Sequence, residues 1–405
     1  MDASGIRPET RFTEYWSEQY TLLSMCVGSY FAVRFAQVSI SPVVPLLLES
    51  FAVSRGTIGL ALTGMWVGYA LAQLPSGVFA DRFGERRLIL AALVITVGAT
   101  LGVAASPSVL LFGAATAALG VGAGTYYNPA TALLTREFDG IGGVIGTHRI
   151  GGQLAGVIAP VVTAAVAVRY GWRPALGLGA ALSVVVAAVF LWRRSSTAPS
   201  RPDASLRELF ASKTLLELLA RSHVRNTTVM MALVEFVGLA AMSFLPVLLV
   251  EHFELSLGRA NLLFAVFFAV SAISQPLGGR LSDRIGRDAT IGIQMTAGVL
   301  GYGALATGGT LTVAVPAVVL AGVATSATTV VQSRILDELS ETNRGTGFGL
   351  FRTTYLLIGA AGTTVVGVTA DAAGWAVAAG LLAALLAAVL GFVLSVRYVD
   401  SAARR

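Results

Sequence analysis

The chain has 405 residues, of which 55% are hydrophobic and 12% charged, and its net charge is +6. A soluble domain carries about 25% charged residues, so about half of the polar surface that water requires is missing. The apolar runs exceed the ~20 residues that cross a bilayer, and they recur along the whole chain. This composition argues against a water-soluble protein and indicates an all-α integral membrane protein surrounded by the lipid bilayer.

Twelve membrane-spanning helices are predicted, six on each side of one long polar segment. The first six are expected at 20–48, 57–79, 87–105, 108–135, 142–168 and 172–192, and the second six at 226–250, 257–279, 288–308, 311–338, 345–370 and 375–396. The predicted division is a tail at 1–19, a bundle at 20–192, a linker at 193–225, a bundle at 226–396 and a tail at 397–405. Within the linker, Ser205 to Arg221 has leucines among charges, which predicts a short amphipathic helix on the membrane surface.

The positions of lysine and arginine predict the orientation. With the N-terminus in the cytoplasm, the inside segments hold 21 of the 28 basic residues, and the outside segments hold only Arg55, Arg169, Arg173 and Arg259. Basic residues are enriched in cytoplasmic loops. We therefore expect a multi-pass protein of the cell membrane with both termini and the linker in the cytoplasm. Because the basic residues lie in short loops between the spans, we attribute the positive net charge to the orientation of the chain in the membrane. We therefore expect no nucleic-acid partner.

The sequence repeats itself once. Gly77 to Gly84 reads GVFADRFG after the second predicted helix, and Gly279 to Gly286 reads GRLSDRIG after the eighth, 202 residues later. The offset persists elsewhere, since Gln73 matches Gln275 and, at 203 residues, Arg149 matches Arg352. Matches that stay in register indicate two six-helix bundles of the same topology, related by a pseudo-twofold axis along the membrane normal.

The repeated G-x-x-x-D-R-x-G pattern resembles the signature of the major facilitator superfamily. Together with the 6+6 layout and the linker, the resemblance covers residues 20–396. It implies the fold of that family, whose members are mostly secondary transporters that rock one bundle against the other by alternating access. It also implies a small-molecule substrate, and we expect a monomer.

The repeated motif is predicted to control the conformational state. By family geometry, Asp81 would face the start of helix eleven (Thr342 to Gly349), and Asp283 the start of helix five (Gly140 to Gly146). A carboxylate at a helix N-terminus gains about 0.3–2 kcal/mol. Such contacts would hold the outward-facing state; alternatively, the Asp–Arg pairs only tie down a short loop. The predicted gating residues are Gly77, Asp81, Arg82, Gly84, Gly279, Asp283, Arg284 and Gly286.

Ionisable residues inside the spans mark a candidate substrate site, because a charge in hydrocarbon costs at least ~2.5–3.5 kcal/mol. Arg34 lies midway along its helix, and its planar fork suits a carboxylate or phosphate; the alternative is a structural salt bridge to Glu235. Arg149 and Arg352 would attract anions, or pair with carbonyls and loop carboxylates. The residues predicted to bind substrate lie on faces expected to point inward: Tyr30, Arg34, Gln37, Tyr127, Asn128, Arg149, Gln153, Gln332, Arg352 and Tyr355.

Glu235 is the only acid well inside a predicted helix, which makes it the leading candidate to carry a coupling proton. His148 is a second candidate. Three scattered histidines, one cysteine and the lack of a P-loop predict no metal, nucleotide or other cofactor. The sequence also shows no clustered nucleophile or carboxylate pair, so an enzyme is not expected.

Two transport functions remain open. The excess of arginine inside the spans favours a proton-coupled transporter of a small organic anion. The alternative is proton-coupled efflux of hydrophobic compounds. Drug antiporters of the family resemble one another in a G-x-x-x-G-P-x-x-G-G pattern on helix five, whereas residues 151–160 read GGQLAGVIAP and contain no Gly-Pro pair.

Overall fold

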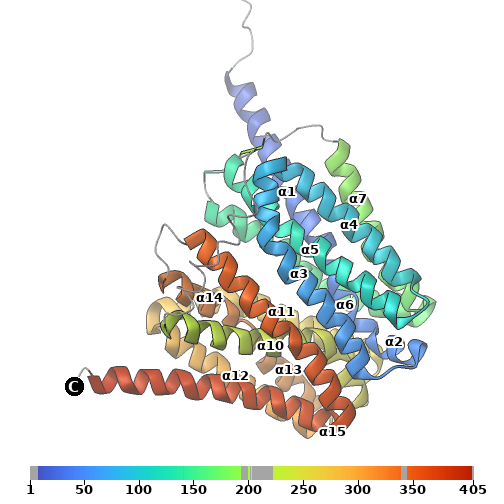
Figure 1. The fold of residues 1–405 in the computed structure, drawn as a ribbon, viewed down its shortest axis with the longest axis vertical. Helices are drawn as coiled ribbons and strands as arrows, with labels where there is room; N and C mark the ends of the chain where they lie inside the picture. The colour runs from blue at the N-terminus through green and yellow to red at the C-terminus, as the bar shows by residue number, and fades with distance from the viewer. Residues whose placement is uncertain are drawn as a thin grey trace, which may run out of the picture.

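A computed structural model of the chain describes residues 8–139, 141–192, 199–200, 202, 222–338 and 344–403. Every regular element among them is a helix, as predicted (Figure 1). The N-terminal bundle contains α1 (Pro8–Val38), η1 (Ser41–Val43), α2 (Val44–Phe51), α3 (Arg55–Phe83), α4 (Glu85–Ala105), α5 (Val109–Glu137), α6 (Ile141–Tyr170) and α7 (Trp172–Trp192). The C-terminal bundle contains α10 (Ser222–Glu251), α11 (Leu257–Ile285), α12 (Arg287–Thr307), α13 (Leu311–Thr325), α14 (Ala327–Glu338) and α15 (Arg344–Ala403).

The described helices account for the twelve predicted crossings. Ten of them, or eleven with the bent α3, are long and apolar enough to cross a membrane. The last of these, Phe348–Ser395, has 48 residues, and ~20 residues are enough for one crossing. Its backbone is not helical at Gly374, where φ is 83°. This stretch therefore holds the eleventh and twelfth predicted helices, which meet at Gly374.

The two bundles repeat each other in backbone geometry as well as in sequence. Helices α3 and α11 each have 29 residues, and α4 and α12 each have 21. The turns between them contain Gly84 at φ 91° and Gly286 at φ 88°. The turn between the last two helices of each bundle also contains a glycine, Gly171 at φ 85° between α6 and α7 and Gly374 at φ 83° within α15. Only glycine adopts such angles readily, so the repeat preserves the residues that the turns require.

Several predicted boundaries are wrong. The first predicted helix is broken between Val38 and Val44, because Pro42 and Pro45 provide no backbone N–H to continue it. The tenth is divided at Ser326. Helix α3 continues to Phe83, so Asp81 lies in its last turn and not in a loop, and the same holds for Asp283 in α11. The helix predicted at Ser205 to Arg221 lies outside the described residues.

Large apolar side chains cover the outside of both bundles. In the N-terminal bundle Leu110 is 80% exposed and Trp192 84%, and in the C-terminal bundle Ile273 is 63% exposed. Water disfavours so many exposed apolar groups, whereas lipid tails accept them. The surface therefore agrees with a protein that spans the membrane many times.

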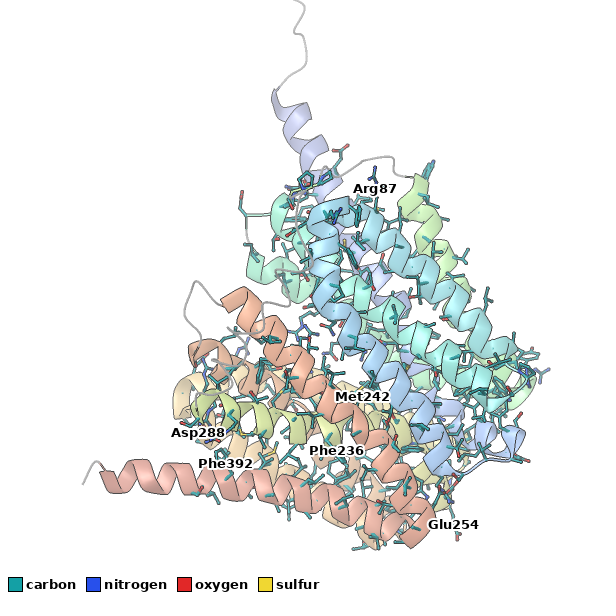
Figure 2. All side chains as sticks on the ribbon, viewed as in Figure 1. Arg87, Phe236, Met242, Glu254, Asp288 and Phe392 are labelled. Atoms are coloured by element: carbon teal, nitrogen blue, oxygen red, sulfur yellow. The ribbon has the colours of Figure 1, made fainter. Side chains whose placement is uncertain are left out.

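The bundles converge at one end and diverge toward the other (Figure 1). Figure 2 labels Glu254 at the converging end, and Arg87 and Asp288 at the diverging ends of the N- and C-terminal bundles. The converging end, which contains Arg55 and Gly374, is called the Arg55 end below. The diverging end, which contains Asp81 and Asp283, is called the Asp81 end.

Candidate functional site

A group of charged residues lies midway between the bundles. Glu235 on α10 is half-buried and lies within electrostatic range of Arg352 on α15 and Arg34 on α1. Neither arginine is within 4 Å of its carboxylate in the described part of the chain. Arg34 instead donates a hydrogen bond from Nη1 to Oε1 of Gln37 at 2.9 Å. The predicted salt bridge between Arg34 and Glu235 is therefore not formed in this structure, although the two residues are brought together.

Arg352 lies among tyrosines from both bundles. Its guanidinium carbon is 5.3 Å from the ring centroid of Tyr127, and its Nη2 donates a hydrogen bond to the hydroxyl of Tyr69 at 3.5 Å. Tyr355 and Tyr30 are also within electrostatic range. Tyr69 on α3 was not predicted to belong to this site, because an aromatic residue in an apolar helix is usually part of the core.

His148 lies behind this site and not on its surface. Its ring is fully buried, with its centroid 5.0 Å from that of Tyr30 and 5.7 Å from that of Tyr127. The hydroxyl of Tyr126 donates to the carbonyl of Cys26 at 2.6 Å, so its oxygen accepts from Nε2 of His148 at 3.2 Å. The role of His148 in coupling stays a prediction.

Of the other predicted binding residues, Gln332 and Arg149 lie near the tyrosines of this site, whereas Gln153 and Asn128 form contacts between helices. Gln332 joins the site through its amide, which donates to the hydroxyl of Tyr355 at 3.2 Å. Arg149 is exposed and lies within electrostatic range of Tyr30. The amide of Gln153 instead connects the two bundles by donating to Gln275 at 3.3 Å. Asn128 donates to the backbone carbonyl of Gln73 at 2.6 Å, so it ties α5 to α3 within one bundle.

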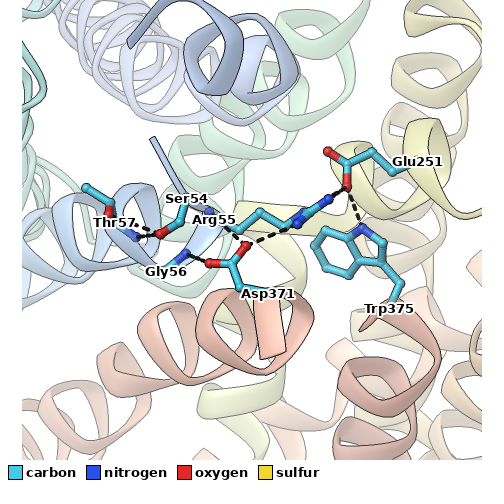
Figure 3. Close-up of polar contacts among 7 residues, drawn as sticks. All are labelled: Ser54, Arg55, Gly56, Thr57, Glu251, Asp371 and Trp375. Carbon is cyan, nitrogen blue, oxygen red and sulfur yellow. Dashed lines mark hydrogen bonds and ion pairs between the residues drawn. The ribbon is translucent and has the colours of Figure 1, made fainter. Parts of the chain in front are cut away.

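The Arg55 end is held by charged contacts between the bundles (Figure 3). Arg55, at the start of α3, donates to Glu251 at 2.5 Å and to Asp371 at 3.1 Å. Trp375 donates from its indole nitrogen to Glu251 at 2.7 Å. These four residues are called the Arg55 cluster below. They come from two bundles and three helices, so the cluster joins the bundles.

Asp371 also caps the helix that carries Arg55. Its carboxylate accepts the backbone N–H groups of Arg55 at 3.1 Å and of Gly56 at 2.7 Å. The first N–H groups of a helix lack intrahelical partners, and the helix dipole favours a negative charge there. The C-terminal bundle thus supplies a carboxylate to a helix start of the N-terminal bundle.

Close backbone approach extends this contact along α3 and α15. A Cβ at Gly59 would lie 2.6 Å from the carbonyl oxygen of Thr363, and one at Gly367 would lie 2.6 Å from that of Arg55. Thr63 donates to the carbonyl of Ala360 at 3.0 Å. Only glycine permits such distances, so the two helices are tightly joined over this half of their length.

At the Asp81 end, the contact described for the motif aspartate reaches the linker. Asp81 accepts a hydrogen bond from Ser200 of the linker at 3.1 Å, and Asp283 is exposed. A Cβ at Gly142 or Gly146 would have nothing within 4 Å. Parts of both target segments, Gly140 and residues 341–343, lie outside the described residues. The gating role of the motif residues stays a prediction.

Three comparisons place these features in a family. A family model described as the Major Facilitator Superfamily matches residues 26–258 and again residues 227–405, so it covers most of the chain. The chain belongs to the Major Facilitator Superfamily.

The described part of the chain contains no group of three or more His, Cys, Asp or Glu residues that could hold a metal ion.

Several curated proteins that resemble this chain have names that refer to transport, extrusion or drug resistance. A nitrite extrusion protein of Bacillus subtilis is 26% identical over 66% of this chain and 67% of its own length. A probable sulfoacetate transporter of Cupriavidus necator is 28% identical, and the matched region covers 66% of this chain but only 65% of that relative. A 4-hydroxybenzoate transporter of Pseudomonas aeruginosa is 26% identical over 75% of each chain. A multidrug resistance protein of Escherichia coli is 25% identical over 56% of this chain and 58% of its own length.

Solved structures of superfamily members share the fold. One is a crystal structure of a bacterial homologue of the human lysosomal transporter Spinster, in an inward-facing and unoccupied conformation. It is 18% identical, the match covers 96% of both chains, and the TM-score is 0.76. At this identity the likeness establishes the arrangement of the helices and not the substrate.

Proposed function

We propose that this chain is a secondary active transporter that moves a small organic anion by alternating access, with protons as the coupling ion. The observation that carries the proposal is the group formed by Arg34, Glu235 and Arg352. Two guanidinium groups and one carboxylate leave one positive charge without a partner. Unpaired charge is costly away from water, so the site favours an anion that completes the pairing.

Glu235 connects this anion site to protons. Its carboxylate and the anion compete for the same two arginines. A proton on Glu235 removes that competition, so the proton and the anion bind together more favourably than the anion alone. Release of both on one side and return of the empty site would give proton-driven symport.

The Arg55 cluster supports an assignment of the conformational state. With both termini in the cytoplasm, the Arg55 end faces outside and the Asp81 end faces inside. The described conformation is then closed to the outside, which corresponds to the inward-facing conformation of the Spinster homologue. Substrate would enter from outside only after the Arg55 cluster separates and the contacts predicted for Asp81 and Asp283 form.

The names of the relatives support an anion over a neutral solute. Nitrite, sulfoacetate and 4-hydroxybenzoate all carry negative charge at neutral pH. The multidrug relative keeps efflux of hydrophobic compounds as the second candidate. A hydrophobic compound has no negative charge to pair with Arg34 and Arg352, so this second candidate does not account for the two arginines.

Purified protein in proteoliposomes tests the proposal. A panel of labelled carboxylates, sulfonates, nitrite and a hydrophobic cation is offered with and without an inward proton gradient. We expect accumulation of an anion that depends on the gradient. Accumulation of the cation alone, or of no anion, would contradict the proposal.

Glu235→Gln separates coupling from binding. The variant keeps the shape of the side chain but cannot release a proton, so it should exchange substrate at equal concentrations and fail to accumulate it against a gradient. If Glu235 only neutralises arginine, breaking that pairing costs roughly 3–5 kcal/mol, and thermal stability should fall. In that case Arg34→Gln in the same protein should restore stability. A stable variant that still accumulates substrate would exclude the coupling role.

A further inference from the structure

Arg352 has most of its hydrogen-bonding capacity unused. A guanidinium presents five N–H donors. In the described part of the chain, the one hydrogen bond from this side chain is the long contact from Nη2 to the hydroxyl of Tyr69. Its Nε is buried and has no partner. A buried donor without an acceptor carries a desolvation cost that a ligand can remove.

Two tyrosine hydroxyls beside Arg352 also have a hydrogen to donate. The hydroxyl of Tyr355 accepts from Gln332, and that of Tyr69 accepts from Arg352. Each hydroxyl owns one hydrogen, and neither donates it to an acceptor in the described part of the chain. By contrast, the hydroxyl hydrogen of Tyr126 is used on the carbonyl of Cys26. The free donors around Arg352 therefore require an acceptor, and a carboxylate supplies two oxygens.

Aromatic rings form the wall next to these donors. The ring of Tyr127 lies against the Arg352 guanidinium, and its centroid is 5.5 Å from that of Tyr30 at an interplanar angle of 52°. Both rings are half-buried, whereas Tyr126 and Tyr355 are fully buried. Tyr30 and Tyr127 therefore each keep part of the ring exposed next to the Arg352 guanidinium.

We propose that the substrate is an aromatic carboxylate, whose carboxylate binds Arg352, Tyr69 and Tyr355 and whose ring packs against Tyr30 and Tyr127. This inference rests on the proposed anion transport and narrows it to one chemical class. The two oxygens of one carboxylate match the donors that Arg352, Tyr69 and Tyr355 offer. Planar rings gain from contact with other aromatic rings beyond the apolar area that they bury.

Two probes that differ only in the ring test whether the substrate ring packs against Tyr30 and Tyr127. Benzoate and cyclohexanecarboxylate carry the same carboxylate on six-membered rings of similar size. Their affinities for the full-length protein in lipid nanodiscs are measured by titration calorimetry. We expect benzoate to bind about twofold to tenfold more tightly, the range that an aromatic pair contributes. In Tyr127→Leu the ratio should fall toward one, since only the Tyr30 ring remains, with cyclohexanecarboxylate changed by no more than about twofold, while Tyr127→Phe should keep the ratio.

The hydroxyl donors are tested with the same two probes. Tyr355→Phe and Tyr69→Phe each remove one hydrogen bond to a charged group, so both probes should bind about tenfold more weakly with the ratio unchanged. Tyr302→Phe is the matched control, because Tyr302 lies on α12 with a buried hydroxyl and is not one of the tyrosines beside Arg352. That variant should bind both probes like the wild type.

The outcomes distinguish this inference from the proposed function. Equal affinities of the wild type for both probes, or an unchanged ratio in Tyr127→Leu, would overturn the aromatic assignment and leave anion transport standing. Binding of neither probe by a protein that transports other anions would also overturn it. If no anion is transported or bound at all, the proposed function fails as well.

Discussion

Each end of the molecule contains a carboxylate of one bundle and a glycine-containing helix start of the other. At the Arg55 end, Asp371 of one bundle accepts N–H groups from the helix start of the other, and glycines let the backbones touch. At the Asp81 end, the motif predicts a carboxylate for a glycine-rich helix start, and the hydrogen bond described for Asp81 comes from Ser200 of the linker. A carboxylate of one bundle at a helix start of the other is therefore a contact that the sequence provides for at both ends. We expect the contacts to alternate between the ends as the bundles rock.

The largest effect is expected from the closest backbone approach. In Gly59→Ala the new Cβ would lie 2.6 Å from the carbonyl oxygen of Thr363, which forces α3 and α15 apart. Overpacking of this kind costs about 1–3 kcal/mol, which shifts a two-state equilibrium by about 5- to 150-fold. We expect the Arg55 end to open and transport to fall.

Spin labels report the opening directly. Labels at Ser50 and Glu254, placed in a background where the single cysteine Cys26 is replaced by alanine, span the Arg55 end between the bundles. Their separation should increase in Gly59→Ala. Gly258→Ala is the control, since a Cβ there would have nothing within 4 Å. An unchanged separation in Gly59→Ala would mean that this contact does not hold the end closed.

A smaller effect is expected from Arg55→Ala. Each partly exposed ion pair contributes about 0–1 kcal/mol, so the loss of both should shift the equilibrium by up to about 30-fold. Substrate affinity should stay within about threefold, because the cluster is remote from the central site. Arg259→Ala removes an exposed arginine at the same end and should change nothing. A loss of binding without a change in label separation would show that Arg55 serves the substrate and not the closure.

The smallest effects should have opposite signs at the two ends. Asp371→Asn weakens the capping of α3 by about 0.3–1 kcal/mol and removes one of the two ion pairs of Arg55, while the pair with Glu251 remains, so it should favour the state with the Arg55 end open. Asp81→Asn weakens the predicted contact of the other state, so it should favour the described conformation and slow transport. Equilibrium substrate affinity should stay within several-fold in both. Shifts of the same sign would contradict the exchange of contacts between ends.

The fold could be predicted because its signals can be read without knowing which residues are in contact. Apolar length gave twelve spans, and residues repeated at an offset of 202, such as Gly84 and Gly286, revealed the two bundles. The charged site was also predictable, since few residues within the spans are ionisable. The five that the sequence singled out include Arg34, Glu235 and Arg352, which lie together, and also His148 and Arg149, whose roles stay predictions.

The Arg55 cluster could not be predicted in the same way. Arg55 is 196 residues from Glu251 and 316 from Asp371, and each lies at a helix end where a charge is ordinary. Their contact depends on how far one bundle is rotated against the other, which no local pattern encodes. Tyr69 was missed for a related reason. Only its contact with Arg352 in the structure distinguishes it from an aromatic residue of the core.

Distances at both ends, measured in the same samples, test the alternation of contacts most directly. A second label pair at Arg87 and Arg280 reports the Asp81 end, and both pairs are compared between the wild type and an Arg55→Ala, Asp371→Asn double variant. We expect a short Ser50–Glu254 and a long Arg87–Arg280 separation in the wild type, and the reverse in the variant. If the Arg55 end opens while the Asp81 end keeps its separation, the two ends do not exchange contacts and the proposed alternation is wrong.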